Sequence, residues 1–258
     1  MVTLAIRTTD DFYNLHNFYD SASDQITGYY MLCNDLDFTG LTEFTSICPT
    51  NKYSGGISWR ATFDGQNHII RNLTLGTSQS KWQRGIFGNI GIGGIVKDVA
   101  FTGAINNAYG GYIAHYIFGT VENVYVEGTC TQTYQNYTDT ENSGSLFAGQ
   151  LGVAYANIQN ITLVATGNWT DHNNAIAGTG AEVDENVIVI GAAQNRILGS
   201  YTSIAEVQAA NAHIKAYVTA KDAADAALSA IGSATFSSAN NIFKIQWNGT
   251  EVYSSTIE

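Results

Sequence analysis

A short phrase of amino acids recurs five times between residues 71 and 191, and this repeat constrains the fold more than any other feature of the sequence. Each copy has a polar residue, then Asn or Asp, then two apolar residues separated by one position. The Asn or Asp positions follow one another at steps of 26, 25, 37 and 26 residues. They are Asn72, Asp98, Asn123, Asn160 and Asn186. A period of this size indicates a stacked-repeat architecture, in which each repeat packs on its neighbours.

Each phrase predicts a β-strand. Apolar and polar residues alternate within it and β-branched residues are frequent, as in a strand with one buried face. One strand in each repeat, with glycines between the strands, is typical of a parallel β-solenoid whose coils lie about 4.8 Å apart. An Asn side chain both donates and accepts hydrogen bonds. We therefore predict that the five Asn or Asp positions form a structural ladder along one corner of the solenoid.

A second phrase, flanked by small residues, precedes the strands from the second repeat onward. In residues 85–90 and 110–115 it begins 13 residues before the Asn or Asp. Together with the upstream stretches 30–38 and 63–73, the two phrases resemble the GLUG-motif repeats of bacterial surface proteins over roughly residues 5–195. The resemblance implies a right-handed parallel β-helix, and it implies no catalytic motif because such repeats are scaffold. The expected fold class is therefore all-β, a right-handed parallel β-helix.

The N-terminal segment predicts a cap for this solenoid. Phe12, Leu15, Phe18 and Tyr19 recur at helical spacing within residues 9–20. Thr9 can cap the helix, and the acidic residues that follow suit its positive end. A short amphipathic helix here would cover the open end of the first coil and its apolar core.

The character of the chain changes after Gly199. Capping signals and apolar spacing predict two helices, roughly 204–218 and 220–231, with one long helix as the alternative. Two strands follow, Ile242–Trp247 and Glu251–Ser255, joined by the hairpin signal Asn248-Gly249. We thus expect a repeat domain at 1–199 and a small α+β appendage at 200–258, which either caps the solenoid or mediates assembly.

Charge and composition exclude several classes of partner. The net charge is −11, and the 11 Lys and Arg residues form no run, which argues against nucleic-acid binding. No stretch is apolar enough to cross a membrane, and the N-terminus lacks the pattern of a secretory leader. The three cysteines, Cys33, Cys48 and Cys130, form neither a disulfide framework nor a zinc pattern. An acidic surface favours cations and neutral or amino-bearing glycans.

Catalytic and metal sites are not predicted. Asp35, Asp37 and Asp64 are the most tempting carboxylates, because some β-helix enzymes place such groups on an outer strand. The expected role of Asp35 and Asp37 is nevertheless a solvated outer face, and that of Asp64 a turn. No Ser-His-Asp set, phosphate loop or dinucleotide fingerprint is found, so no catalytic residue, metal or cofactor is assigned.

A Tyr-rich region is the candidate binding surface. The insertion 129–143 carries Tyr134 and Tyr137, and Tyr109 and Tyr112 belong to the preceding repeat. Exposed Tyr rings can stack on sugar faces or contact a protein, and ordinary packing along strands is the alternative. We take these four tyrosines as candidate ligand-binding residues for a glycan or a protein partner.

The sequence favours a non-enzymatic structural or adhesive protein. We expect a phage or virus virion component, such as a tail fibre, spike or capsid decoration, that attaches to a host or its glycans. It would work on the virion or extracellular surface as a homo-oligomer, or as a subunit fixed to other virion or surface proteins. The alternatives are a bacterial cell-surface adhesin and a polysaccharide lyase or hydrolase.

Overall fold

The structure is a computed structural model of the 258-residue chain. It describes residues 3–42, 44–48, 57–75, 85–105, 111–130, 147–151, 155–167, 177–179, 187–190, 201, 203–231, 234–239, 242–247 and 250–256. The chain divides into two compact units, Met1–Asn211 and Ala212–Glu258.

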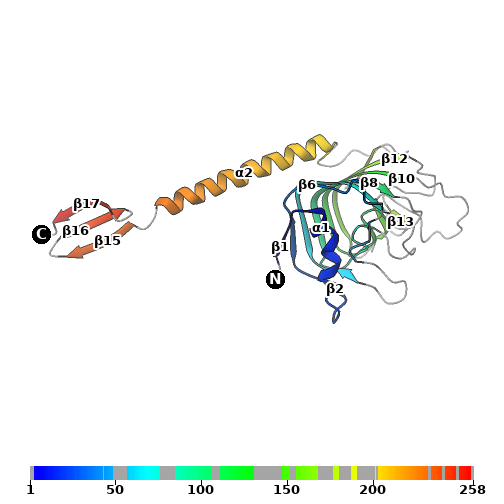
Figure 1. Ribbon diagram of the computed structural model, residues 1–258, viewed down its shortest axis with the longest axis horizontal. Coiled ribbons are helices and arrows are strands. Elements are labelled where there is room, and N and C mark those ends of the chain that lie inside the picture. Colours follow the sequence, from blue (N-terminus) through cyan, green and yellow to red (C-terminus); the bar gives the residue numbers. More distant parts are fainter. Residues whose placement is uncertain are drawn as a thin grey trace, which may run out of the picture. The chain divides into compact units, whose positions relative to one another are not determined.

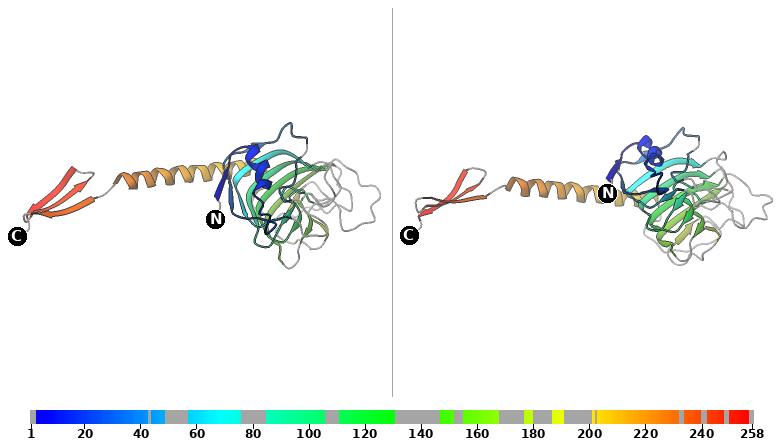
Figure 2. Two further views of the ribbon diagram at one scale, coloured as in Figure 1. Left: turned by 60° about the horizontal axis from the view of Figure 1, so that its bottom comes forward. Right: turned by 90° about the horizontal axis from the view of Figure 1, so that it is seen from below.

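The first unit is built on two parallel sheets between which the chain passes back and forth (Figures 1 and 2). The larger sheet has the order β1 (Thr3–Ile6), β3 (Tyr29–Leu32), β6 (Thr62–Leu75), β8 (Ile95–Ile105), β10 (Thr120–Cys130), β12 (Asn157–Gly167) and β14 (Val187–Ile190), and β4 (Leu36–Asp37) also pairs with β6. The smaller sheet has the order β13 (Ala177–Thr179), β11 (Ala148–Leu151), β9 (Ala114–Ile117), β7 (Asn89–Ile90), β5 (Ser58–Trp59) and β2 (Gln25–Ile26).

The core of this unit lies between the two sheets. Both sheets contribute to one cluster of buried apolar residues, and the largest fully buried side chains in it are aromatic. Phe87 has its ring centroid 5.2 Å from that of Trp59 and 5.4 Å from that of Phe63. Edge-to-face contacts of this kind add to the stabilisation from burial. Both sheets therefore turn apolar side chains toward this core.

The expectation of an all-β, right-handed parallel β-helix is wrong for this chain. The described strands form two open parallel sheets, and helix α2 (Ile204–Ile231), 28 residues long, gives the chain a mixed α and β content. The repeat period did predict strands that pair in parallel, as the described strands of both sheets do. Alternation within a strand specifies which face is buried, but it does not specify that the successive strands close into a helical coil.

Left-handed backbone conformations explain the Asn or Asp of the repeat. Asp98, Asn123 and Asn160 have φ of 52°, 53° and 52°, a region that Asn and Asp tolerate better than other residues with a side chain. At the bend, the alternation of inward and outward side chains shifts by one position. Val96 and Val99, three residues apart on β8, therefore both lie in the core. Each such residue therefore turns the strand around the edge of the core.

A short helical segment covers one end of the core. Helix α1 (Thr9–Tyr13) continues into the 3-10 helix η1 (Asn14–Phe18), so the expected helix is present but divided. The N-cap is Thr8 rather than Thr9, because Thr8 and Asp11 exchange hydrogen bonds in a capping box. Phe12 and Leu15 are fully buried, whereas Phe18 is 44% exposed. Only the first half of the predicted apolar face therefore serves the core.

The second unit contains most of α2 and a three-stranded antiparallel sheet. The single helix replaces the predicted pair and matches the alternative of one long helix. The sheet has the order β15 (Ala234–Ala239), β16 (Ile242–Trp247) and β17 (Thr250–Thr256). Strands β16 and β17 correspond to the two strands expected from the sequence, and β15 is an additional strand. The structural division falls after Asn211, within α2, whereas the sequence placed it after residue 199.

Candidate binding groove

The candidate site lies on the outer face of the larger sheet, where rows of side chains point away from the core. The row nearest the Asn bends is Ile69, Ala100, Tyr125 and Thr162, which are level with one another on successive strands. Three of these side chains form a buried cluster with Val207. The beginning of α2 therefore covers this row.

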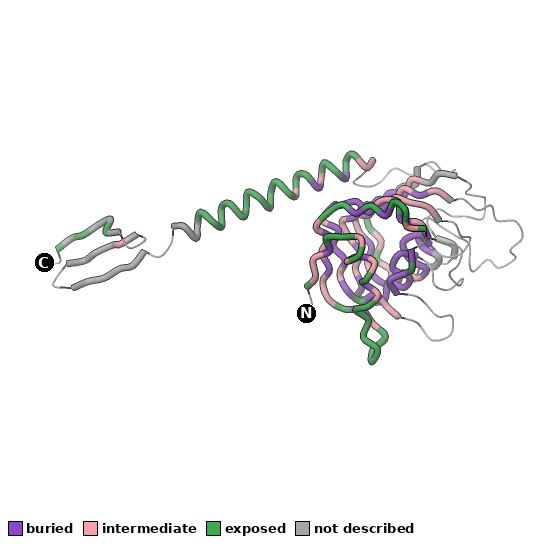
Figure 3. The backbone as a smooth tube through the Cα atoms, viewed as in Figure 1, coloured by how far each residue is buried: buried purple, intermediate pink, exposed green. Residues whose placement is uncertain are grey.

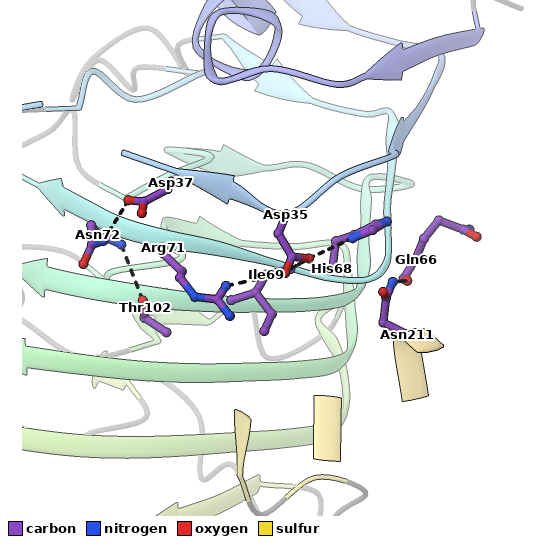
Figure 4. Close-up of polar contacts among 9 residues, drawn as sticks. All are labelled: Asp35, Asp37, Gln66, His68, Ile69, Arg71, Asn72, Thr102 and Asn211. Carbon is purple, nitrogen blue, oxygen red and sulfur yellow. Dashed lines mark hydrogen bonds and ion pairs between the residues drawn. The ribbon is translucent and has the colours of Figure 1, made fainter. Parts of the chain in front are cut away.

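Polar contacts hold the segment that leads into α2 on the same row. The Tyr201 hydroxyl donates to Asn67 Oδ1 at 2.8 Å, and Thr162 Oγ1 donates to the Tyr201 carbonyl at 2.6 Å. Asn211 Nδ2 donates to the carbonyl of Gln66 at 2.8 Å (Figure 4). These bonds satisfy buried backbone and side-chain groups, so the cover is specific rather than a loose apolar contact.

Further along the strands the outer face is uncovered by any described residue and forms a shallow groove. Its volume is about 350 Å³, and it crosses β6, β8 and β10. The lining is mostly hydroxyl and amide groups with one carboxylate: Asn72, Thr74, Thr102, Gly103, Ala104, Glu127 and Thr129. Such a lining presents donors and acceptors to a polar ligand and offers little apolar surface.

The parallel register arranges these groups in two rows. Thr74, Ala104 and Thr129 are level with one another, and Thr102 is level with Glu127. Neighbouring strands lie about 4.8 Å apart, so the groups repeat at a regular spacing across the groove. The Glu127 carboxylate accepts a hydrogen bond from the Tyr125 hydroxyl at 3.2 Å. Burial, and then the charge of Glu127, raise the pKa of Tyr125, so this phenol stays a hydrogen-bond donor.

The floor of the groove depends on a glycine. A Cβ on Gly103 would lie 2.0 Å from the carbonyl oxygen of Leu73 and 2.4 Å from the Tyr112 hydroxyl. That hydroxyl donates to the same carbonyl at 2.7 Å. Gly103 therefore leaves the space in which Tyr112 reaches across the core to the back of the groove.

Asn72 lies at one end of the groove and not in the predicted ladder. Its Nδ2 donates to Asp37 Oδ1 at 2.8 Å (Figure 4). The same Nδ2 also donates to Thr39 Oγ1 at 2.9 Å. The pairing of β6 with β8 is irregular between Asp64 and His68 and again after Ile70, which displaces Asn72 to the level of Thr102. A fixed count of residues cannot anticipate these bulges.

The remainder of the ladder forms where the structure describes it. Asn160 Nδ2 donates to Asn123 Oδ1 at 3.0 Å, and Asn123 Nδ2 donates to Asp98 Oδ1 at 2.9 Å. The three residues thus follow one another on β8, β10 and β12 at a single bend. Asn186 lies outside the described residues.

The structure removes Tyr112 from the candidate ligand surface. Its ring is fully buried, and burial raises the pKa of its phenol far above the usual value. Its role is packing, the alternative considered for these tyrosines. Tyr109, Tyr134 and Tyr137 lie outside the described residues.

The carboxylates singled out in the sequence are tied into structural clusters. Asp35 Oδ1 lies 2.8 Å from His68 Nδ1 and accepts from the Ile69 backbone N–H at 3.2 Å. Its Oδ2 lies 3.6 Å from Arg71 Nη1 (Figure 4). The cluster joins the segment before β4 to β6. Asp37, the last residue of β4, accepts hydrogen bonds from Asn72 and Thr39, and these bonds, that of Asn72 first, lower the pKa of Asp37.

A second cluster surrounds the nearly buried Asp64. Tyr29 Oη donates to its Oδ2 at 2.5 Å, and Lys97 Nζ lies 3.3 Å from that oxygen and 3.1 Å from Asp98 Oδ2. Burial and the bond to Asp64 raise the pKa of Tyr29 to about 12. Burial lowers the pKa of Lys97, but Asp64 and Asp98 outweigh it and raise the value to about 12. The cluster links β3, β6 and β8 and continues into the ladder.

The repeat period gives no signal for the groove. Thr74, Thr102 and Thr129 are 28 and 27 residues apart, whereas the Asn or Asp positions of the same phrases are 26 and 25 residues apart. The proximity of the three threonines depends on the register between strands, which requires the fold.

Comparisons with known proteins identify no family. No family model and no curated protein matches the chain. One solved structure, a "putative immunoglobulin A1 protease" from Bacteroides ovatus, is similar with a TM-score of 0.49 and 19% sequence identity. The similarity covers 72% of this chain and about half, 54%, of that protein.

The described residues show neither a metal-binding cluster nor a membrane-spanning helix. Within the part of the chain that the structure describes, no group of three or more His, Cys, Asp or Glu side chains is arranged to hold a metal ion. No helix among the described residues is long and apolar enough to cross a membrane. Cys33 and Cys48 are both free thiols.

Proposed function

We propose that this protein is a non-enzymatic structural and adhesive protein whose groove on the larger sheet binds neutral or amino-bearing carbohydrate. The observation that carries the proposal is the composition of the groove. Hydroxyl and amide groups from Asn72, Thr74, Thr102 and Thr129 surround the single carboxylate of Glu127. Sugars present closely spaced hydroxyl groups, which such a lining can bond as both donor and acceptor.

The charge of the protein sets the class of sugar. The chain carries 22 acidic and 11 basic residues, and the groove itself contains Glu127. Acidic polysaccharides are therefore repelled, whereas an amino sugar gains a favourable contact with the carboxylate. None of the described residues that line the groove is aromatic, so binding by these residues relies on hydrogen bonds and each site is expected to be weak.

The carboxylate clusters support a scaffold role in preference to hydrolysis or lyase chemistry. General acid-base catalysis works best with groups whose pKa lies near the operating pH. The pKa values of Tyr29 and Lys97 are instead raised to about 12, so both groups keep their protons at neutral pH. Their partner Asp64 is 5% exposed and engaged with both of them.

The proposed setting is the surface of a virion, as a tail fibre, spike or capsid decoration that contacts host glycans. The stacked strands, the low content of charged residues, 13%, and the polar outer face suit a module displayed on a surface. The sequence resemblance to GLUG-motif repeats is part of this proposal and leaves a bacterial adhesin as the second setting. Mass spectrometry of purified particles distinguishes the two settings.

The test of the binding site is a glycan array followed by titration with the full chain. Thr102→Val with Thr129→Val removes two hydroxyl groups at nearly constant volume. Each lost hydrogen bond costs about 0.5–1.5 kcal/mol, so the affinity should fall by about 5-fold to 100-fold. Thr120→Val, on the same strand as Thr129 but outside the groove, is the matched control and should change the affinity less than about twofold.

Two results would contradict the proposal. One is an array of neutral, amino and acidic glycans on which the protein binds nothing, or binds equally well with both threonines replaced. The other is release of soluble oligosaccharides from a capsule or cell-wall preparation by the purified protein, which would make it an enzyme.

A further inference from the structure

A second cavity lies where the helical cap of the core meets the segment that follows β4. Its volume is about 370 Å³. A Cβ on Gly40 would meet no described atom within 4 Å, so there is free space above this turn. The segments around the cavity mix exposed, half-buried and buried residues, unlike the buried strands behind them (Figure 3). The lining residues are Thr9, Asp10 and Tyr13 of α1, and Asp37, Phe38, Thr39, Gly40 and Leu41.

A hydrogen-bonded bridge separates this second cavity from the groove. Asn72 lines the groove, and its Nδ2 donates to Asp37 and Thr39, which line the second cavity. Because β4 pairs with β6, Asp37 lies one strand beyond the strands that the groove crosses. At about 4.8 Å between strands, the distance from β10 to β4 is about 14 Å. The groove and the second cavity therefore adjoin, and together they are longer than a single sugar ring.

Two carboxylates give the second cavity a negative charge. Asp10 is exposed, and its carboxylate has no hydrogen-bond or ion-pair partner among the described residues. Asp37 accepts its described side-chain bonds at Oδ1, which leaves Oδ2 for a ligand. The hydrogen bonds to Asp37, that of Asn72 first, lower its pKa, and Arg71 has the smallest influence on it. An ammonium group is therefore a favourable ligand for this cavity.

Apolar groups complete the lining of the second cavity. Tyr13 and Leu41 are half-buried beside the exposed carboxylates. The Tyr13 ring lies edge-to-face against Phe44 and His16, with centroid distances of 5.6 and 5.8 Å, so packing holds it in place. An aromatic ring close to carboxylates favours a cation with an apolar body. The second cavity thus supplies the aromatic contact that is missing from the described lining of the groove.

We propose that the second cavity is a subsite for a free amino group of an oligosaccharide whose other residues lie in the groove. The inference rests on the proposed carbohydrate site and narrows its ligand to a glycan of several residues with unacetylated amino sugars. A sugar ring offers an apolar face of C–H groups to Tyr13, and its protonated amine is attracted by Asp10 and Asp37. An acetylated amine has no charge and loses this attraction.

Continuity with the groove favours a glycan over a basic side chain of a protein partner. A lysine side chain would occupy the second cavity alone and would leave the row of groove hydroxyl groups without a role. A glycan chain has a hydroxyl or amino group on every residue, so it can bond the groove threonines, the bridging Asn72 and the second cavity together.

The experiment is titration of the full chain with glucosamine oligomers and with the same oligomers in N-acetylated form, at about pH 6, where amines are protonated. The affinity for the glucosamine series should rise from the monosaccharide to the tetrasaccharide, as the ligand reaches both cavities. Asp10→Asn removes one exposed charge and should weaken binding of the tetrasaccharide by about twofold to fivefold. It should leave the binding of the N-acetylated series unchanged.

Two further variants complete the experiment. Asp24→Asn removes the same charge from an exposed position outside both cavities, where Asn tolerates the φ of 52°, and should leave the affinity unchanged. Tyr13→Leu keeps an apolar side chain but removes the ring, and should weaken binding of the glucosamine tetrasaccharide by about twofold to fivefold. Urea unfolding of each variant shows whether it remains folded.

The possible results separate this inference from the proposed groove. Equal affinity for the two series, or an Asp10→Asn variant that binds the glucosamine tetrasaccharide as the wild type does, overturns the second subsite. In that case the groove still stands if Thr102→Val with Thr129→Val weakens binding. A protein that binds no glycan contradicts both. Binding of a lysine-rich peptide that depends on Asp10, without binding of any glucosamine oligomer, overturns the inference and assigns the cavity to a protein partner.

Discussion

Asn123 gives the sharpest test of how the repeat works, because its backbone and its side chain have separable roles. Its φ of 53° lies in the left-handed region. Its amide donates to Asp98 at 2.9 Å and accepts from Asn160 at 3.0 Å. Asn123→Gly keeps the backbone conformation and removes both hydrogen bonds, whereas Asn123→Ala removes the bonds and also strains the backbone.

The magnitudes follow from these two contributions. Two hydrogen bonds are worth about 1–3 kcal/mol together, and glycine adds about 0.4–1 kcal/mol through the entropy of the unfolded chain. The Gly variant should therefore lose about 1.5–4 kcal/mol. A left-handed residue with a Cβ costs about 1–2 kcal/mol, so the Ala variant should lose about 2–5 kcal/mol and be the less stable of the two.

The assay is urea unfolding of the full chain, followed by far-ultraviolet circular dichroism and analysed for the transition of the two parallel sheets. Asn157→Ala, an exposed Asn on β12 that lies outside the bend, is the control and should change stability by less than about 1 kcal/mol. An Ala variant as stable as the Gly variant would refute the argument from backbone conformation. A Gly variant as stable as the wild type would show that the ladder contributes nothing.

Two further predictions concern the groove floor and alkaline pH. Gly103→Ala should lower the free energy of unfolding by about 1–3 kcal/mol in the same urea assay, because the added Cβ would lie 2.0 Å from the Leu73 carbonyl oxygen. Adding Tyr112→Phe to this variant should not restore the lost stability, because the clash with the carbonyl remains. A Gly103→Ala variant as stable as the wild type would contradict this account of the groove floor. The pKa values of Tyr29 and Lys97 are both raised to about 12 in the folded protein, so the protonated groups stabilise the fold. This contribution is complete at pH values below about 10, the ordinary pKa of these groups, and is lost as the pH rises from about 10 to 12. Tyr29→Phe should flatten that part of a stability-against-pH curve, and an unchanged slope would show that the phenol is not linked to folding.

The strands were the part of the fold that could be read from the sequence. The apolar alternation around Val99 and Val124 predicted strands at β8 and β10, and the period predicted that they stack in parallel. The role of Asp98 and Asn123 was only half anticipated. Their hydrogen bonds follow from side-chain chemistry, whereas their positive φ is a backbone property that the polar and apolar pattern does not encode.

Register was the information that the sequence lacked. Asn72 matches the repeat phrase, but the irregular pairing of β6 with β8 moves it away from the column of Asp98. Tyr112 is of a residue type common at binding surfaces, but its ring lies in the core and its hydroxyl fits beside Gly103. The groove threonines come from three strands, and only the paired register brings them together.

The continuous pairing of β8 with β10 has a consequence for how proteins of this kind change in length. The two strands match from Ile95 opposite Thr120 to Ile105 opposite Cys130, a step of 25 residues without an irregularity. Duplicating one such segment inserts another strand into each sheet, another Asn at the bend and another pair of outward positions beside the groove. The capping segment around Phe12 contacts none of these strands by hydrogen-bonded pairing and need not change. Recombination between repeats thus offers a route by which descendants of this chain gain or lose ligand-contacting rows one at a time.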